Sequence, residues 1–122
     1  MVGFLKASDP RMRTTMAQIQ AQLTDQGLVN RYREDDGLPG REATFTPCAF
    51  WLAENLALAG RLEEAWEQFA RVVAWANDVG LLSEEINPAS GELLGNFPQG
   101  LSHLALIRTA VRLTALSARR LA

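Results

Sequence analysis

The sequence is poor in the residue types from which disulfides and metal sites are made. It contains one cysteine, Cys48, and one histidine, His103, and the two stand far apart in the chain. No internal disulfide can form, and these residues make no usual metal-ligand pattern. We therefore expect neither a metal nor a cofactor. Cys48 stands in an apolar run, where a small buried hydrophobic side chain is its expected role.

The sequence also lacks a basic block, a long hydrophobic run and a phosphate-binding motif. The formal net charge is -2, and no cluster of Lys and Arg has the density of a nucleic-acid-binding face. No apolar run approaches the ~20 residues that span a bilayer, and the N-terminal residues lack the pattern of a signal peptide. Residues 37–40 (GLPG) lack the Lys and Ser or Thr of a P-loop. We expect a cytoplasmic protein that binds neither nucleic acid nor a membrane.

What is present is the composition of an ordinary soluble domain, with helical periodicity in four stretches. Of the 122 residues, 48% are hydrophobic and 21% charged, which excludes wholesale disorder. The first stretch, residues 10–27, should begin at Asp9, whose side chain can cap free N–H groups, with Pro10 at the first helical position. The second, residues 46–59, is apolar nearly all round, which indicates a buried helix that stops at Gly60.

The third and fourth stretches repeat this arrangement. Residues 61–78 carry one apolar stripe, so we expect them to cover the second helix as an antiparallel hairpin. Their polar face is made of Glu63, Glu64, Glu67, Gln68 and Arg71. Residues 98–119 are mostly apolar, as in the second helix, and their arginines complement the helix dipole at the C-terminal end.

Two loops of about 19 residues, 27–45 and 79–97, precede the two apolar helices. Both exceed the roughly 2–8 residues usual between packed helices. The Gly-Leu pair at 27–28 recurs at 80–81, so the chain consists of two units, each with an outer helix, a long loop and an inner helix. The fold class we predict is all-α: a partial (α/α)6 toroid of about two outer/inner helix hairpin units, with two long loops on one rim.

The second long loop is rich in carboxylates, with Asp78, Glu84, Glu85 and Glu92. Glu84 and Glu85 follow the C-terminal end of a predicted helix, where the helix dipole disfavours anions. Glycoside hydrolysis needs one carboxylic acid to protonate the leaving oxygen and a second carboxylate to activate water or attack directly. A sugar-hydrolysing site is one interpretation of this pair, and solvated surface charge is the other.

Neutral polar and aromatic side chains flank the same region. The groups that can hydrogen-bond sugar hydroxyls are Asn96, Gln99 and His103, and the aromatic faces for stacking are Trp51, Phe45 and Tyr32. Each also has a structural interpretation. Trp51 can belong to the core, His103 can be a satisfied side chain at a helix start, and Tyr32 can anchor its loop.

Two long motifs cover much of the chain: residues 36–52 are DGLPGREATFTPCAFWL, and residues 81–104 are LLSEEINPASGELLGNFPQGLSHL. Together they closely resemble the C-terminal part of glycoside hydrolase family 15, the bacterial glucoamylase-like and trehalase-like enzymes. The resemblance begins around residue 3 and covers nearly the whole chain. It implies an α/α six-hairpin toroid that removes glucose from α-glucosides with inversion at the anomeric carbon.

The resemblance also implies roles for single residues. Glu84 corresponds to the general base that activates the attacking water, and Glu85 is the reserve candidate. Substrate contacts are expected from Glu42, Trp51, Asn96, Gln99 and His103. The family's general acid belongs to an earlier hairpin that nothing in this sequence matches. We therefore expect residues 1–122 to be a C-terminal fragment of the catalytic domain, inactive or nearly so when alone.

Several alternatives stay open at this point. Ala43 stands where the family has Gly, and Gly100 where it has Ala, so the shape of the substrate pocket is not fixed by the resemblance. The residues do not choose between trehalose and a starch-type oligosaccharide. The alternative function is a standalone helical-hairpin module that binds proteins without catalysis, although such scaffolds normally use short turns. As a fragment, the chain should expose apolar edges and self-associate.

Overall fold

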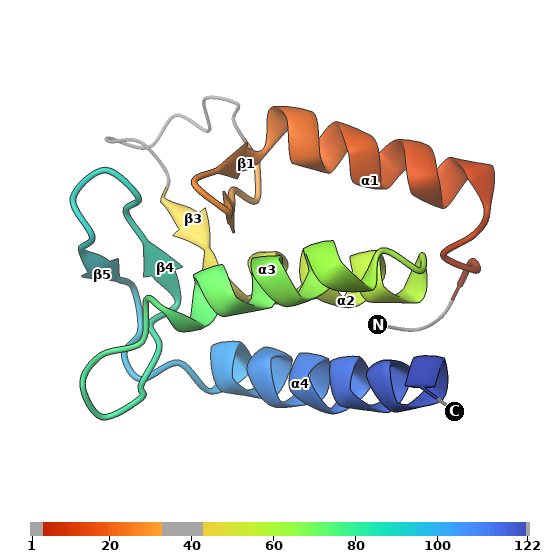
Figure 1. The fold of residues 1–122 in the computed structure, drawn as a ribbon. Helices are drawn as coiled ribbons and strands as arrows, with labels where there is room; N and C mark the ends of the chain where they lie inside the picture. The colour runs from red at the N-terminus through yellow and green to blue at the C-terminus, as the bar shows by residue number, and fades with distance from the viewer. Residues whose placement is uncertain (1–3, 33–42, 122) are drawn as a thin grey trace.

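The computed structural model describes residues 4–32 and 43–121. Within these ranges the elements are α1 (Pro10–Gln22), β1 (Thr24–Asp25), β2 (Leu28–Val29), β3 (Thr44–Phe45), α2 (Thr46–Leu58), α3 (Leu62–Val73), β4 (Glu85–Ile86), β5 (Leu93–Leu94) and α4 (Gly100–Leu121). In Figure 1, α2 and α3 lie between α1 and α4, and β3, β4 and β5 gather at one end of the helices. The predicted turn at 35–40 and the candidate Glu42 fall outside the described residues.

The second helix is buried on nearly all sides, as its composition indicates. α3 and α4 both pack against it, and Met16 of α1 joins the same core. Phe50 and Leu56 of α2 are almost completely inaccessible to solvent, and burying one side chain of this size contributes roughly 1.5–3 kcal/mol. Leu82, from the second long loop, belongs to this core too, so the loop is anchored by burial.

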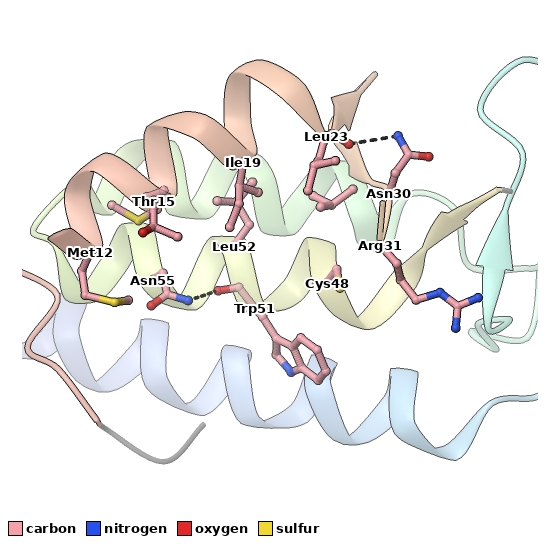
Figure 2. Close-up of a pocket in the computed structure, with 12 residues that line it drawn as sticks. Met12, Thr15, Ile19, Leu23, Asn30, Arg31, Cys48, Trp51, Leu52 and Asn55 are labelled. Carbon is pink, nitrogen blue, oxygen red and sulfur yellow. Dashed lines mark hydrogen bonds between the residues drawn. The ribbon is translucent and has the colours of Figure 1, made fainter. Parts of the chain in front are cut away.

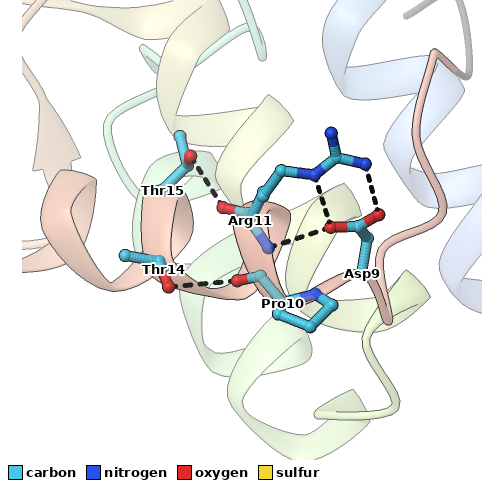
Figure 3. Close-up of polar contacts among 5 residues, drawn as sticks. All are labelled: Asp9, Pro10, Arg11, Thr14 and Thr15. Atoms are coloured by element: carbon cyan, nitrogen blue, oxygen red, sulfur yellow. Dashed lines mark hydrogen bonds and ion pairs between the residues drawn. The ribbon is translucent and has the colours of Figure 1, made fainter.

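The predicted start of the first helix is confirmed. Asp9 precedes Pro10, and its Oδ1 accepts the backbone N–H of Arg11 at 2.9 Å, which satisfies one of the free N–H groups of the first turn. Figure 3 shows the Arg11 guanidinium returning to the same carboxylate, with Nε–Oδ1 at 3.0 Å and Nη2–Oδ2 at 2.9 Å. These side-chain bonds, followed by the backbone bond, lower the pKa of Asp9. The helix therefore starts at a well-defined cap.

The first helix ends at Gln22, earlier than residue 27, because a β-hairpin follows it. β1 and β2 pair antiparallel, Thr24 with Val29 and Asp25 with Leu28, so Gln26 and Gly27 form the turn. Both turn residues have positive φ, +48° and +82°. This is the turn geometry whose twist matches that of paired strands. In the sequence, Gly27 was the signal for such a turn.

The described chain is mostly helical, as predicted, but it is not all-α, because the two long loops meet in a three-stranded antiparallel sheet. β3 of the first loop pairs with β4 of the second, Thr44 with Ile86 and Phe45 with Glu85, and β4 pairs with β5. Thr44 and Ile86 are buried, and buried backbone groups need hydrogen-bond partners, which strand pairing supplies. The described parts of both loops lie at the same end of the helices, as predicted.

The third helix ends at Val73, five residues before the predicted end at 78. Asn77 forms the turn that follows: its Oδ1 accepts the N–H of Leu81 at 2.8 Å and that of Val79 at 3.2 Å. Gly80 has φ of +80°, a conformation that glycine adopts without steric cost. The chain is thereby turned back toward the core, where Leu82 is buried.

The fourth helix has two different faces, so in the described chain it is not buried on nearly all sides as α2 is. Ser102, Ala105, Thr109 and Leu113 are buried, on the side that packs against α2 and α3. The exposed large apolar residues are Leu101 at 43%, Leu104 at 66%, Ile107 at 56% and Val111 at 66%; we call these four the α4 stripe. The predicted exposed apolar edges are therefore present. Composition alone could not show which face lacks a partner.

Candidate active site

Glu84 is fixed to the fold through its backbone on two sides. Its carbonyl accepts the N–H of Thr46, the first residue of α2, at 3.0 Å, and its own N–H donates to the carbonyl of Asn96 at 2.9 Å. One bond ties it to the first long loop and the central helix, and the other to the far end of its own loop. Glu84 is thus a loop residue whose backbone is held on both sides, on one of them by the start of α2, and a catalytic group must be held in position in this way.

The Glu84 carboxylate is held mainly by neutral donors. The backbone N–H of Asn96 donates to Oε2 at 3.1 Å, and the side-chain Nδ2 of Asn96 donates to the same oxygen at 2.7 Å. These two bonds, in that order, lower the pKa of Glu84, with smaller contributions from a hydrogen bond to Gln99 and from the charge of Arg31, against an opposing effect of burial. Hydrogen bonds to the charged form of a carboxyl favour ionisation. A half-buried, ionised carboxylate of this kind can accept a proton from water.

Glu85, the reserve candidate, has different surroundings. It lies in β4, the central strand of the sheet, and its Oε1 pairs with Nη2 of Arg31 at 3.0 Å. The Arg31 guanidinium also lies 4.9 Å from the centre of the Phe45 ring, a cation–π distance. Glu85 is engaged in an ion pair with Arg31.

Three residues at the start of the fourth helix tie the loop down beside Glu84. Nε2 of His103 accepts the N–H of Leu82 at 3.1 Å, and the Ser102 hydroxyl donates to the carbonyl of Ser83 at 2.8 Å. The N–H of Gln99 donates to the carbonyl of Leu82 at 2.9 Å. His103 therefore contacts the backbone, with Nε2 as an acceptor. The two residues that precede Glu84 are held by the first turn of α4 and by Gln99, the residue before it.

Trp51 lines a groove of about 250 Å³ between α1 and α2. Figure 2 shows Met12, Thr15, Ile19 and Leu23 on the α1 side, Cys48, Trp51, Leu52 and Asn55 on the α2 side, and Arg31 at one end. The Trp51 ring packs edge-on to Phe45, with centroids 6.5 Å apart. Burial raises the pKa of the Cys48 thiol, against a weaker effect of the Arg31 charge, so Cys48 remains a neutral thiol.

The structure brings together some of the predicted site residues and separates others. Asn96 and Gln99 surround the Glu84 carboxylate, whereas Trp51 lines the groove and His103 binds backbone. Gly95 and Arg31 were not predicted as site residues from the sequence. For Arg31 no periodic signal existed, and for Gly95 the only signal was a glycine immediately before Asn96.

Within residues 4–32 and 43–121, no group of three or more His, Cys, Asp or Glu side chains is placed to hold a metal ion. None of the described helices combines the length and hydropathy needed to cross a membrane.

Comparison with known proteins gives one family and a set of relatives. The model of glycosyl hydrolases family 15 matches residues 1–111. Trehalase of Thermoplasma volcanium is 47% identical over 114 residues, which are 93% of this chain and 18% of the relative. Trehalase of Mycolicibacterium smegmatis is 47% identical over 114 residues, 91% of this chain and 17% of the relative. No solved structure gives a significant match.

A more distant relative agrees with these. Trehalase 1 of Sulfolobus acidocaldarius is 29% identical over 117 residues, which are 96% of this chain and 21% of the relative. The chain thus spans about a fifth of the length of the curated relatives it matches, or less. The family model covers nearly the whole sequence, including both long motifs and Glu84. This chain belongs to glycosyl hydrolases family 15.

Proposed function

We propose that the chain supplies the general base of an inverting α-glucoside hydrolase, and that Glu84 is this base. The observation that carries the proposal is the Glu84 carboxylate, held at Oε2 by two donors of Asn96 and kept ionised by them. A general base must be unprotonated at the start of the reaction. Glu85 is less suited to the role because its charge is paired with Arg31.

The chemistry follows from these groups. Glu84 takes a proton from a water molecule as the water oxygen attacks the anomeric carbon from the face opposite the leaving group. The bond from that carbon to the glycosidic oxygen breaks, and a general acid protonates the leaving oxygen. The two carboxyl groups of an inverting pair stand roughly 6.5–9.5 Å apart, which leaves room for the water. The configuration at the anomeric carbon is inverted.

The general acid of this pair is proposed to lie outside this chain. The matched region is 18% of one relative and 17% of the other, so most of a relative's polypeptide has no counterpart here. We propose that residues 1–122 are the C-terminal part of an (α/α)6 catalytic domain, contributing two outer/inner helix units and the rim formed by the two long loops. Alone, the chain should bind substrate poorly and turn over little or none.

Trehalose is the substrate we propose, with a starch-type α-glucan as the alternative. The relatives at 47% identity are named trehalases, and this favours a disaccharide of two glucose units. Gln99 and Glu42 are proposed to contact sugar hydroxyls. Trp51 is a weaker candidate, since it faces the α1–α2 groove, and His103 is weaker because Nε2 is already bonded to Leu82.

A chimera tests this function. The matched 114 residues of the Mycolicibacterium smegmatis trehalase are replaced by the corresponding residues of this chain. The folded chimera should hydrolyse trehalose and release one α- and one β-glucose at first, as inversion at one anomeric carbon requires. The isolated chain serves as the control and should release none. Release of two α-glucose molecules by the chimera would contradict inversion, and hydrolysis of maltose or longer α-glucans in preference to trehalose would contradict the substrate.

A further inference from the structure

We propose that Asn96 is a positioning residue for the general base and not a substrate contact, and that Gly95 gives it the room to approach. The inference rests on the proposed role of Glu84. It concerns the pair of residues at positions 95 and 96, which form the end of the loop that starts beside Glu84. Its consequence is that the orientation of the base is set inside this chain, before any other part of the enzyme contributes.

Three hydrogen bonds connect Glu84 with Asn96, and they run in both directions. The N–H of Glu84 donates to the carbonyl of Asn96 at 2.9 Å. The N–H and Nδ2 of Asn96 donate to Oε2 of Glu84 at 3.1 and 2.7 Å. Backbone and side chain of Glu84 are thus held by one residue, so the side-chain torsions are fixed relative to the loop. Both of these donors converge on Oε2.

Gly95 lies against the same carboxylate. It has φ of +71°, and a Cβ built on it would stand 2.9 Å from the Cβ of Glu84 and 3.0 Å from Oε2. A side chain at this position would therefore force the Glu84 side chain or the loop to shift. Gly80, in the same loop, has a similar φ of +80° but nothing within 4 Å of its position for Cβ. Substituting Gly80 would therefore introduce backbone strain alone, whereas substituting Gly95 would introduce the same strain and a contact with the Glu84 carboxylate.

The donors also set the charge state of the base. Asn96 is neutral, so it stabilises the anion without cancelling its charge, unlike Arg31 at Glu85. The two bonds from Asn96 are the largest causes of the lowered pKa of Glu84, and the Gln99 hydrogen bond and the Arg31 charge add less. Loss of the Asn96 side chain removes one of these two bonds and should therefore raise the pKa of Glu84.

The first test measures the titration of Glu84 in the 122-residue chain by carboxyl 13C NMR. Asn96→Ala should move the midpoint of Glu84 to higher pH. Asn96→Asp should move it further, because a second carboxylate replaces a donor at the same place. Asn96→Asp has nearly the shape of the native residue, so it keeps the test available if Asn96→Ala does not fold. Asn87→Ala, in the β4–β5 turn, is the control and should leave the midpoint where it is. An unchanged midpoint in both Asn96 variants would overturn the inference.

The second test uses the trehalase chimera. Asn96→Ala should lower kcat by roughly ten- to a hundredfold, the cost of a misplaced catalytic group, change KM little and shift the acid limb of the kcat profile to higher pH. A substrate contact would instead raise KM and leave the acid limb in place, which would overturn the positioning role. Gly95→Ala should reproduce the loss of kcat, whereas Gly80→Ala should not.

The two proposals fail in different ways. If Glu84→Gln keeps near-native turnover in the chimera, the base assignment falls, whatever the Asn96 variants do. If Glu84→Gln is inactive while Asn96→Ala and Asn96→Asp keep the native kcat and pH profile, only the positioning role falls.

Discussion

Glu54 of α2 is completely buried, and its carboxylate meets the guanidinium of Arg108 from α4. Nε of Arg108 lies 3.1 Å from Oε2, although the hydrogen bonds of Arg108 go to Oε1, at 3.3 and 3.2 Å. Nε of Arg112 lies 3.6 Å from Oε1. A carboxylate is buried in proteins only with such compensation. The two arginines therefore connect α2 to α4, the helix whose first residues hold the loop that carries Glu84.

Removing both arginines should leave an uncompensated buried charge. Arg108→Ala with Arg112→Ala is expected to lower the free energy of unfolding by ~3–5 kcal/mol, and each single substitution by less than half of that, since the other arginine remains. Adding Glu54→Leu to the double variant should restore part of the loss. Urea unfolding followed by circular dichroism measures all four proteins. Small, strictly additive effects of the two arginines would contradict a shared role.

The ion pair between Arg31 and Glu85 should matter less for stability. Arg31 is exposed at 41% and Glu85 at 19% of their side chains, and such pairs contribute about 0.2–1 kcal/mol, with screening by salt. We expect Glu85→Gln to lower the free energy of unfolding by that amount in low salt and by less in 1 M NaCl. A larger, salt-independent loss would mean that Glu85 has a further structural role.

His103 offers a test between substrate contact and structural support. His103→Phe removes the acceptor for the N–H of Leu82, a residue that is itself buried, and an unpaired buried N–H costs about 1–3 kcal/mol. His103→Gln can still accept this bond and should cost less. Hydrogen exchange at the Leu82 amide should be accelerated in His103→Phe alone. Native stability in His103→Phe would favour the substrate-contact hypothesis instead.

The α4 stripe predicts self-association. Leu104 and Val111, each exposed at 66%, lie on one face of a helix, and a contiguous exposed apolar surface favours association. We expect the isolated chain to form dimers or larger species in sedimentation at high concentration. Leu104→Lys with Val111→Lys should return it to a monomer without loss of helix content. A monomeric parent chain would contradict this prediction, and association that survives both substitutions would place the contact elsewhere.

The parts of the fold that depend on residues close together in the sequence could be predicted from the sequence. Asp9 and Pro10 start α1 because a cap acts within one helical turn, and α2 is buried because its own composition leaves no polar face. Gln68 shows where this fails. Its place on a polar face predicted exposure, but it is 6% exposed, because Nε2 donates to the carbonyls of Gly27 and Ala49.

The candidate site, too, could be predicted from the sequence only in part. The residues alone gave four loop carboxylates, and only the family resemblance singled out Glu84, with Glu85 in reserve. The different surroundings of these two come from residues remote in sequence. Asn96 is 12 positions from Glu84, and Arg31 is 54 positions from Glu85. The pairing of β3 with β4 is of the same kind, since neither two-residue strand has a recognisable pattern alone. Such contacts are fixed by the packing of the two loops, which no local rule describes.

The central claim is that Glu84 activates the attacking water, and substitution of the two adjacent glutamates in the trehalase chimera tests it most directly. Steady-state kcat on trehalose is measured for Glu84→Gln and Glu85→Gln, with thermal unfolding to establish that both proteins fold. We predict that Glu84→Gln lowers kcat by at least about a hundredfold, the usual contribution of a general base, while Glu85→Gln stays within about tenfold of the parent. Near-native turnover by a folded Glu84→Gln protein, or loss of activity in Glu85→Gln alone, would contradict the account.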